Sequence, residues 1–112
     1  MVSHLVLLKP RPDLTGDGRQ RLIAAFERAL REIPTIRAVR VGRRRRIGAG
    51  YETGMPELDY FVEIDFDDVD GLKRYLDHPA HRELGDRFSD SLAGALVFDF
   101  EQVGLEALRD LS

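Results

Sequence analysis

Apolar residues fall into short runs typical of β-strands and into longer stretches with helical spacing. The first run, Val2–Lys9, is apolar almost throughout and stops at Pro10, which predicts a buried strand. Over Leu58–Phe66 apolar and polar side chains alternate, which predicts a strand with one buried face. Two more strands are predicted over Ile36–Val41 and Ala95–Glu101.

The remaining stretches have the three-to-four-residue spacing of amphipathic helices. A first helix is predicted over about Arg19–Ile33, after a loop over Arg11–Gly18. A second helix is predicted over Val69–Asp77, with Asp67 or Asp68 as its cap. The residues of this second helix that are predicted to point inward are Val69, Leu72 and Leu76.

Pro79 separates the second helix from a third. Proline disfavours helical geometry at the residue before it, so the second helix is predicted to break at His78. Proline also suits the first position of a helix, so the third helix is predicted to begin at Pro79. His81 falls on the same face of this helix as Leu84 and Phe88, and it is therefore expected to point inward.

The predicted order of strand, helix, strand, strand, helix and strand is that of the ferredoxin-like α+β fold. This fold has one four-stranded antiparallel sheet with its helices on one face. The other face carries apolar residues too, and Leu96, Phe98 and Phe100 of the last strand are examples. An apolar sheet face open to water is unfavourable, so we expect a homodimer that pairs through this face.

The composition is that of a globular protein with one domain. The 112 residues carry a net charge of −3 and include no cysteine, which excludes disulfides, a thiol nucleophile and thiolate metal sites. The N-terminal residues form neither a basic leader nor a long apolar run. We therefore expect a cytoplasmic protein without a membrane partner.

One run of basic residues contrasts with the negative net charge of the chain. Arg43–Arg46 lies at the start of a polar, glycine-punctuated stretch, Gly42–Pro56, and is interpreted as a solvated hairpin tip. The alternative is a patch that binds phosphate or nucleic acid. Because acidic residues elsewhere outweigh the run, we expect no nucleic-acid partner.

Candidate chemistry is centred on the segment Tyr75–His81. An inward imidazole at His81 needs a partner, and its pKa near neutrality suits a general base. Tyr75 supplies a phenol to the same cavity from across the helix break. His78 is interpreted as a cap or an anchor at this break. We expect no metal at His78 and His81, because the proline break spoils their register and no cysteine is available.

A second polar pair is predicted where the first and last strands lie side by side. In the ferredoxin-like order these strands are neighbours, so His4 and Asp99 come close together. A carboxylate between Phe98 and Phe100 is unusual unless it is paired, and an aspartate that orients a histidine is a recurring device. The alternative interpretation is structural, namely that such bonds only satisfy buried polar groups and hold a helix to the sheet.

Together these pieces resemble the stress-responsive α/β-barrel (Dabb) domain family. The resemblance covers residues 1–102, which leaves Val103–Ser112 as a C-terminal extension with the potential to form a short helix. The block Tyr75–His81, with its His-Pro-Ala-His sequence, is the most specific part. The other matching pieces are His4–Lys9, Ile33-Pro34, Val41–Arg43, Tyr60–Phe66 and Phe98–Phe100.

The resemblance implies a ferredoxin-like protomer that pairs through its sheet into a dimeric α/β barrel. Most members have no established activity, and several are linked to stress responses. A plant polyketide cyclase in the family performs an intramolecular aldol condensation without metal or organic cofactor. Its base histidine matches His81, its tyrosine matches Tyr75, the aspartate paired with that base matches Asp99, and a further pocket histidine matches His4.

Three functions follow from these expectations. The first is a stress-related dimeric barrel that binds a small apolar ligand in a cavity between sheet and helices. The second is a cofactor-free cyclase or aldol-type lyase, in which His81 abstracts a proton and Asp99 holds the tautomer of His81. Tyr75 or His4 then stabilises the developing oxyanion. The third is a monooxygenase of the dimeric α/β-barrel type. A filled interior, with the His81 imidazole bonded only to backbone, would exclude the second function.

Overall fold

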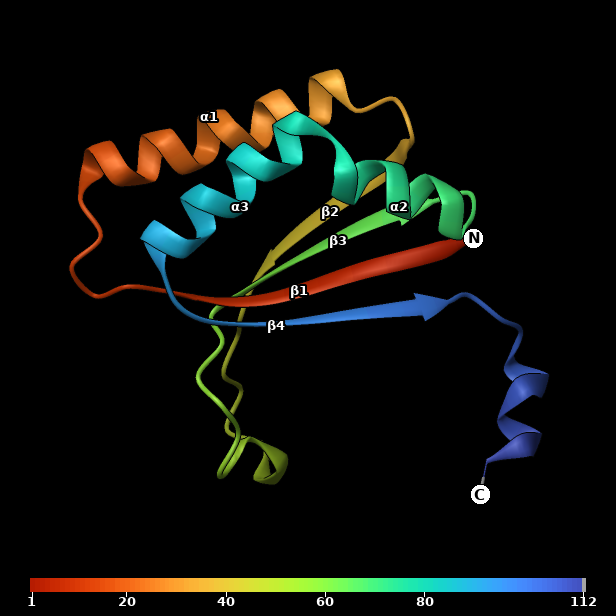
Figure 1. Ribbon diagram of the computed structural model, residues 1–112. Helices are drawn as coiled ribbons and strands as arrows, with labels where there is room; N and C mark the ends of the chain where they lie inside the picture. The colour runs from red at the N-terminus through yellow and green to blue at the C-terminus, as the bar shows by residue number, and fades with distance from the viewer. Residues whose placement is uncertain (112) are drawn as a thin grey trace.

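Four strands form one antiparallel sheet in the order β2-β3-β1-β4 (Figure 1). The structure, a computed structural model, describes residues 1–111. The strands are β1 (Val2–Pro10), β2 (Ile36–Arg43), β3 (Tyr60–Phe66) and β4 (Leu92–Glu101). The helices are α1 (Gly16–Glu32), α2 (Val69–Asp77) and α3 (Pro79–Ser91), with short 3₁₀-helices η1 (Gly50–Glu52) and η2 (Leu105–Asp110). The predicted ferredoxin-like fold is therefore confirmed.

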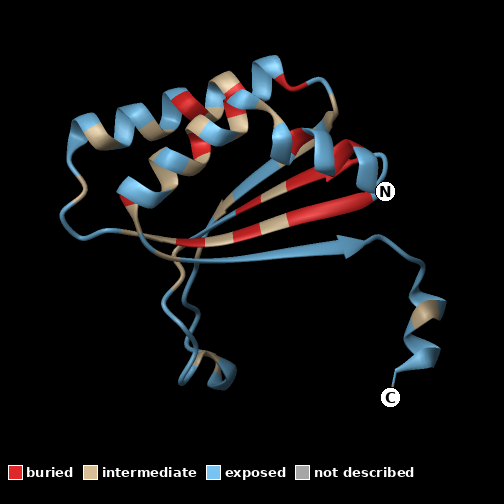
Figure 2. Cartoon of the chain, viewed as in Figure 1, coloured by how far each residue is buried: buried red, intermediate tan, exposed pale blue. Residues whose placement is uncertain are grey.

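All three α-helices lie over the same face of the sheet, and the core fills the space between them (Figures 1 and 2). Ile64 and Phe66 of β3 are the largest fully buried side chains in this space. Small residues such as Ala29 of α1 and Ala80 of α3 are also buried there. Within the part of the chain that the structure describes, no helix is long and apolar enough to cross a membrane.

The register of the central strand β1 decides which side chains meet under the helices. Val6 lies opposite Val62 of β3 and Val97 of β4. Two residues away, His4 lies opposite Ile64 and Asp99 in the same way. Because residues two apart share a face of a strand, the His4 side chain lies on the helix-covered face.

Several element boundaries differ from the predicted ones. Helix α1 begins at Gly16, three residues before the predicted start, because Thr15 caps it by accepting a hydrogen bond from the Gly18 amide at 3.0 Å. Strand β4 begins at Leu92 rather than Ala95. Strand β3 begins at Tyr60, two residues after the predicted Leu58.

The buried face of α2 also differs from the prediction. Leu72 is buried as predicted, but Val69 and Leu76 are exposed. Tyr75 is buried in their place. Gly71 lies on this inward side too, since a Cβ there would be in ordinary van der Waals contact with the sheet, 3.6 Å from the Phe66 Cβ.

The face of the sheet opposite the helices is apolar and uncovered. Phe61, Leu96, Phe98 and Phe100 are exposed on it, and Figure 2 shows strand β4 exposed along most of its length. Across the ladder Phe98 lies opposite Leu5 and Leu96 opposite Leu7, whereas Phe100 lies opposite Ser3. We call this surface the open face. The hairpin between β2 and β3 and the C-terminal segment both project on this side of the sheet (Figure 1).

The break between α2 and α3 is held by His78. Its Nδ1 accepts a hydrogen bond from the Ala80 amide at 3.0 Å, so the imidazole caps α3, while its own amide donates to the Tyr75 carbonyl at 3.2 Å. The predicted helix break at His78 and its predicted capping role are both confirmed. The break changes the direction of the chain at His78, so that Tyr75 lies on α2 and His81 on α3.

We expect His78→Ala to destabilise the folded chain by about 1 kcal/mol, because the Ala80 amide loses its capping acceptor. Urea denaturation followed by circular dichroism measures the free energy of unfolding. The control is His78→Asn, whose side-chain oxygen can take over as cap and should recover most of the loss. Equal stability of the wild type and His78→Ala would contradict the capping role.

Candidate functional site

A pocket of about 200 Å³ lies between the helix-covered face of the sheet and the helices. Three of the four predicted site residues, His4, Tyr75 and His81, line it. The interior is therefore not filled, so the first part of the condition that would exclude the second function is not met. The other lining residues, nearly all apolar, are Val6, Phe26, Val62, Ile64, Leu76, Leu84, Gly85, Phe88 and Val97.

The three polar residues reach this pocket from three different elements. His4 comes from the central strand β1, where it is buried among apolar neighbours. Tyr75 comes from the last turns of α2, and His81 from the first turn of α3, just beyond the break at His78. The strand register and the helix break together bring them to one place.

The Tyr75 ring contacts both imidazoles. Its centroid lies 4.7 Å from that of His81 and 5.7 Å from that of His4, with both pairs in tilted or edge-on geometry. Phe66 also contacts the Tyr75 ring, at a centroid distance of 5.2 Å. Such aromatic contacts restrict the orientation of each ring, so the three polar side chains form a pre-organised group.

The Tyr75 hydroxyl has access to the pocket. Only 3% of the residue is exposed, yet the hydroxyl makes no hydrogen bond with any residue in the range 1–111. In the same range, no completely buried side-chain nitrogen or oxygen lacks a hydrogen-bond partner. The hydroxyl oxygen is therefore not sealed in the core. It is free to bond to a molecule in the pocket that it lines.

His4 and Asp99 form a tight pair, as the strand order predicts. The two residues lie directly opposite each other on β1 and β4, and the His4 Nδ1 is 2.6 Å from the Asp99 Oδ1. An ionised carboxylate can only accept, so the imidazole Nδ1 is the donor. This length is that of a charge-assisted bond, which leaves the Nε2 of His4 as its uncommitted nitrogen.

The structure pairs Asp99 with His4 rather than with His81, whose tautomer it was expected to hold. The antiparallel register places Asp99 opposite His4, and the carboxylate bonds to His4 instead. His81 lies in the first turn of α3, where the backbone of Leu76 is its hydrogen-bond partner. The base predicted from the resemblance therefore lacks the aspartate that the resemblance implies.

The pocket favours the neutral forms of both His81 and Tyr75. Burial lowers the pKa of His81 below its ordinary value, and the nearby His4 lowers it further, while the hydrogen bond with Leu76 opposes the shift. Burial raises the pKa of Tyr75 to about 12. At neutral pH the pocket therefore offers a neutral imidazole that can accept a proton and a phenol that can donate a hydrogen bond.

Sequence reasoning missed the walls of the site. Phe26, Val62 and Phe88 line the pocket, and they also line a second, larger hollow of about 650 Å³ that extends toward Tyr60 and Val41. The sequence marks Phe26 and Phe88 as inward-facing, but an inward aromatic residue has the same spacing whether it fills a core or borders a cavity.

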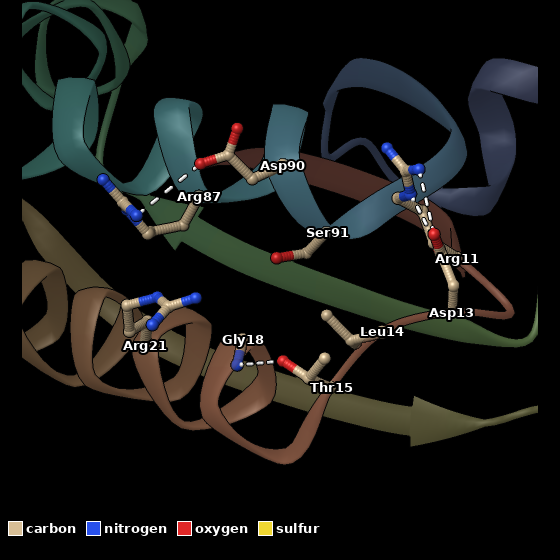
Figure 3. A pocket seen from close by; sticks show the side chains of 9 residues that line it. All are labelled: Arg11, Asp13, Leu14, Thr15, Gly18, Arg21, Arg87, Asp90 and Ser91. Carbon is tan, nitrogen blue, oxygen red and sulfur yellow. Dashed lines mark hydrogen bonds and ion pairs between the residues drawn. The ribbon is translucent and has the colours of Figure 1, made fainter.

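Another hollow, of about 180 Å³, lies between the start of α1 and the end of α3 (Figure 3). Arginines line it, but Arg11 donates to Asp13 at 3.0 and 3.2 Å, and Arg87 lies 3.6 Å from Asp90. Because carboxylates neutralise most of this charge, we assign no anion site to it. Over residues 1–111, no group of three or more potential ligand side chains is placed to hold a metal ion.

Comparison with known proteins identifies relatives over nearly the whole chain. The model of the stress responsive A/B barrel domain family (Dabb) matches residues 2–102. Olivetolic acid cyclase from Cannabis sativa is 26% identical over 102 residues, which cover 88% of this chain and 94% of the cyclase. The resemblance seen in the sequence is thereby confirmed.

Solved structures share the fold. A dimeric ferredoxin-like protein of unknown function from Jannaschia sp. CCS1 has a TM-score of 0.72 and 27% identity, covering 90% of this chain and 98% of that protein. Hydroxynitrile lyase from Passiflora edulis has a TM-score of 0.73 and 17% identity, covering 92% and 96%. The second likeness concerns the fold alone, since one fold carries many activities.

The lowered pKa of His81 is open to direct measurement. In the folded protein we expect its imidazole to titrate below 6.5, and in urea it should return to this ordinary value. Histidine NMR signals, assigned with His81→Gln, measure both midpoints. A folded midpoint at or above 6.5 would contradict the burial of the ring.

The sign of the effect on stability follows from these midpoints. As the pH falls through 6.5, unfolded His81 binds a proton before folded His81 does, so the free energy of unfolding decreases. Below the folded pKa the loss is complete. The His81→Gln variant should lack this part of the acid sensitivity.

Proposed function

The chain belongs to the stress-responsive A/B barrel domain (Dabb) family, and we propose that it acts as a homodimer that binds a small apolar carbonyl compound in the pocket beside His81. The observation that carries this proposal is the convergence of Tyr75, His81 and His4 on one otherwise apolar cavity. A stress-related role, in keeping with the description of the family, is part of the proposal.

The open face supports the homodimer. Exposed phenylalanines at Phe61, Phe98 and Phe100 lie on one surface with no helix over it. Exposed apolar patches of this kind mark interaction sites, and a second copy with the same face is a self-complementary partner. The related Jannaschia protein of the same fold is dimeric.

The size and lining of the pocket support a small ligand. Its volume of about 200 Å³ is below the range of roughly 300–1,000 Å³ that suits drug-sized molecules. Apolar walls favour a hydrocarbon body, whereas the Tyr75 hydroxyl can donate to one oxygen atom of the ligand. A carbonyl compound satisfies both requirements.

A second candidate function, a cofactor-independent cyclase or aldol-type lyase, is favoured by the 4.7 Å contact between Tyr75 and His81. In it, neutral His81 removes a proton from the carbon next to the carbonyl group. The electrons of the broken C–H bond form an enolate, whose oxygen accepts a hydrogen bond from Tyr75. The enolate carbon then attacks a second carbonyl, and protonated His81 returns its proton to the new alkoxide.

The role of His4 in this candidate follows from its bond to Asp99. The carboxylate fixes the ring with Nδ1 as donor, so Nε2 is the nitrogen left for the pocket. His4 then acts as a positioning and polarising residue next to Tyr75 rather than as the base. The monooxygenase alternative draws no comparable support, because the convergence of a base and a phenol is what proton transfer requires.

We expect the wild-type chain to be a dimer in size-exclusion chromatography with light scattering at micromolar concentration, and Phe98→Arg to be a folded monomer. An arginine there would have to be buried unpaired in an apolar interface, at a cost of several kcal/mol. Val69→Arg, at an exposed position on the helix-covered side, is the matched control and should stay dimeric. A monomeric wild type would refute the homodimer.

Ligand binding and proton transfer can be separated with 2-heptanone, a small apolar ketone. Saturation-transfer NMR reports its binding, and exchange of its α-hydrogens for deuterium in D₂O reports base catalysis. We expect wild-type protein to bind the ketone and to accelerate the exchange. His81→Gln should lower the rate of this exchange about 10²–10⁴-fold without loss of the fold or of ketone binding.

Tyr75→Phe should reduce the exchange by roughly 10²–10³-fold, because it removes the donor to the enolate oxygen. His78→Asn, next to the pocket but outside its lining, is the control that should retain the exchange. Binding without accelerated exchange would leave the ligand-binding proposal standing and refute the enzyme. Absence of both binding and exchange would refute both for this compound class.

A further inference from the structure

The C-terminal segment beyond β4 carries apolar side chains with nothing to cover them. Leu105 is 80% exposed, Leu108 is 55% exposed and Leu111 is 77% exposed. Scattered exposed leucines are ordinary, but three in seven consecutive residues form a concentrated apolar patch. We call the stretch of residues 103–111 the arm.

The 3₁₀ geometry of the arm aligns these leucines. Leu105 and Leu108 lie in η2, and Leu111 follows it directly. A 3₁₀-helix has three residues per turn, so side chains three positions apart lie one above the other. The three leucines therefore form one stripe, while Glu106 and Arg109 point in other directions.

The arm is tied to its own protomer only at its root. The Gln102 amide donates to the Met1 carbonyl at 2.9 Å, and its side chain donates to Ser3 at 2.8 Å and to Asp65 at 3.3 Å. Beyond Gln102, the hydrogen bonds within residues 103–111 join residues of the arm to each other. Gln102 is thus fixed to the sheet, and the leucine stripe extends away from the sheet beyond it.

The direction of the arm relates it to the open face. Ser3 and Asp65, which anchor Gln102, lie on the face of the sheet away from the helices, because they pair in register between residues that face the core. Figure 1 shows the arm leaving the end of β4 and running away from the sheet on that same side. A second copy that covers the open face therefore occupies the space beside the arm.

We propose that the leucine stripe of the arm packs against the second copy of this chain and that each protomer of the dimer holds the other in this way. This inference rests on the proposed homodimer. The arm follows β4 directly along the chain, and β4 contributes the exposed apolar side chains Phe98 and Phe100 to the open face. Its own sheet is not the partner, because the segment runs away from it.

The first test measures the dimer dissociation constant of the full chain by analytical ultracentrifugation. Replacing both Leu105 and Leu108 with serine should weaken the dimer by at least about 100-fold, because two buried leucine side chains are lost from each arm. Val69→Ser, an exposed apolar residue on the helix-covered side, is the matched control and should leave the constant unchanged.

The second test asks which copy covers the arm. The chain has no cysteine, so Leu108→Cys provides a single thiol whose reaction rate with a disulfide reagent reports its exposure. We expect protection of the thiol to rise with protein concentration in step with the dimer fraction of the same variant. Protection that is independent of concentration would place the arm on its own protomer and overturn the inference.

The combined outcomes of the two tests distinguish packing of the arm on the second copy from dimerisation itself. A wild type that is dimeric, with an unchanged constant in the double variant and an unprotected thiol, overturns the arm and leaves the dimer in place. A wild type that is monomeric at all concentrations overturns the proposed dimer and the arm with it. Weaker association together with concentration-dependent protection supports the inference.

Discussion

Strand β1 lies in the middle of the sheet and carries apolar side chains on both faces, so both faces have to be shielded from water. On one side, Val6 and its partners Val62 and Val97 lie beneath the helices or at their margin. On the other side, Leu5 and Leu7 face away from the helices. A single chain of this length provides helices for one face only, and the uncovered face is where a second copy gains the most apolar burial. The pocket and the face that we propose as the dimer interface are thus on opposite sides of one strand.

The helix break at His78 is what makes room for a site on the covered side. A continuous helix in place of α2 and α3 would point Tyr75 and His81 in different directions, since they are six residues apart. The proline-induced break instead lets two helices bring a phenol and an imidazole to the same cavity. Burial then shifts the pKa of His81 down and that of Tyr75 up, and both shifts favour the neutral form. An apolar pocket thereby retains two polar groups without holding a charge on either.

Much of this arrangement can be predicted from the sequence, because it depends on local patterns. The alternation along Tyr60–Phe66, the proline at position 79 and the strand order that joins His4 to Asp99 are all visible there. The rotation of α2 is not, because it depends on how the helix packs against the sheet rather than on the spacing of its own apolar residues. The partner of His81 is not visible either, because the sequence offers Asp99 to both His4 and His81, and only the structure shows that its carboxylate bonds to His4. Cavity walls escape prediction for a similar reason, since Phe26 has the same pattern in a filled core.

The structural and functional interpretations of the polar residues can now be weighed against each other residue by residue. The His4–Asp99 pair is explained by structure alone, because a buried imidazole gains its hydrogen bond from a carboxylate on the next strand. Tyr75 is different: phenylalanine would fill the same space, and the hydroxyl bonds to no residue in the range 1–111. The hydroxyl oxygen is not completely buried, so the pocket that it lines is where its bonding partner would lie. The oxygen of the proposed ligand would accept a hydrogen bond from it. The phenol of Tyr75, more than any histidine, is therefore the group that favours the proposed ligand.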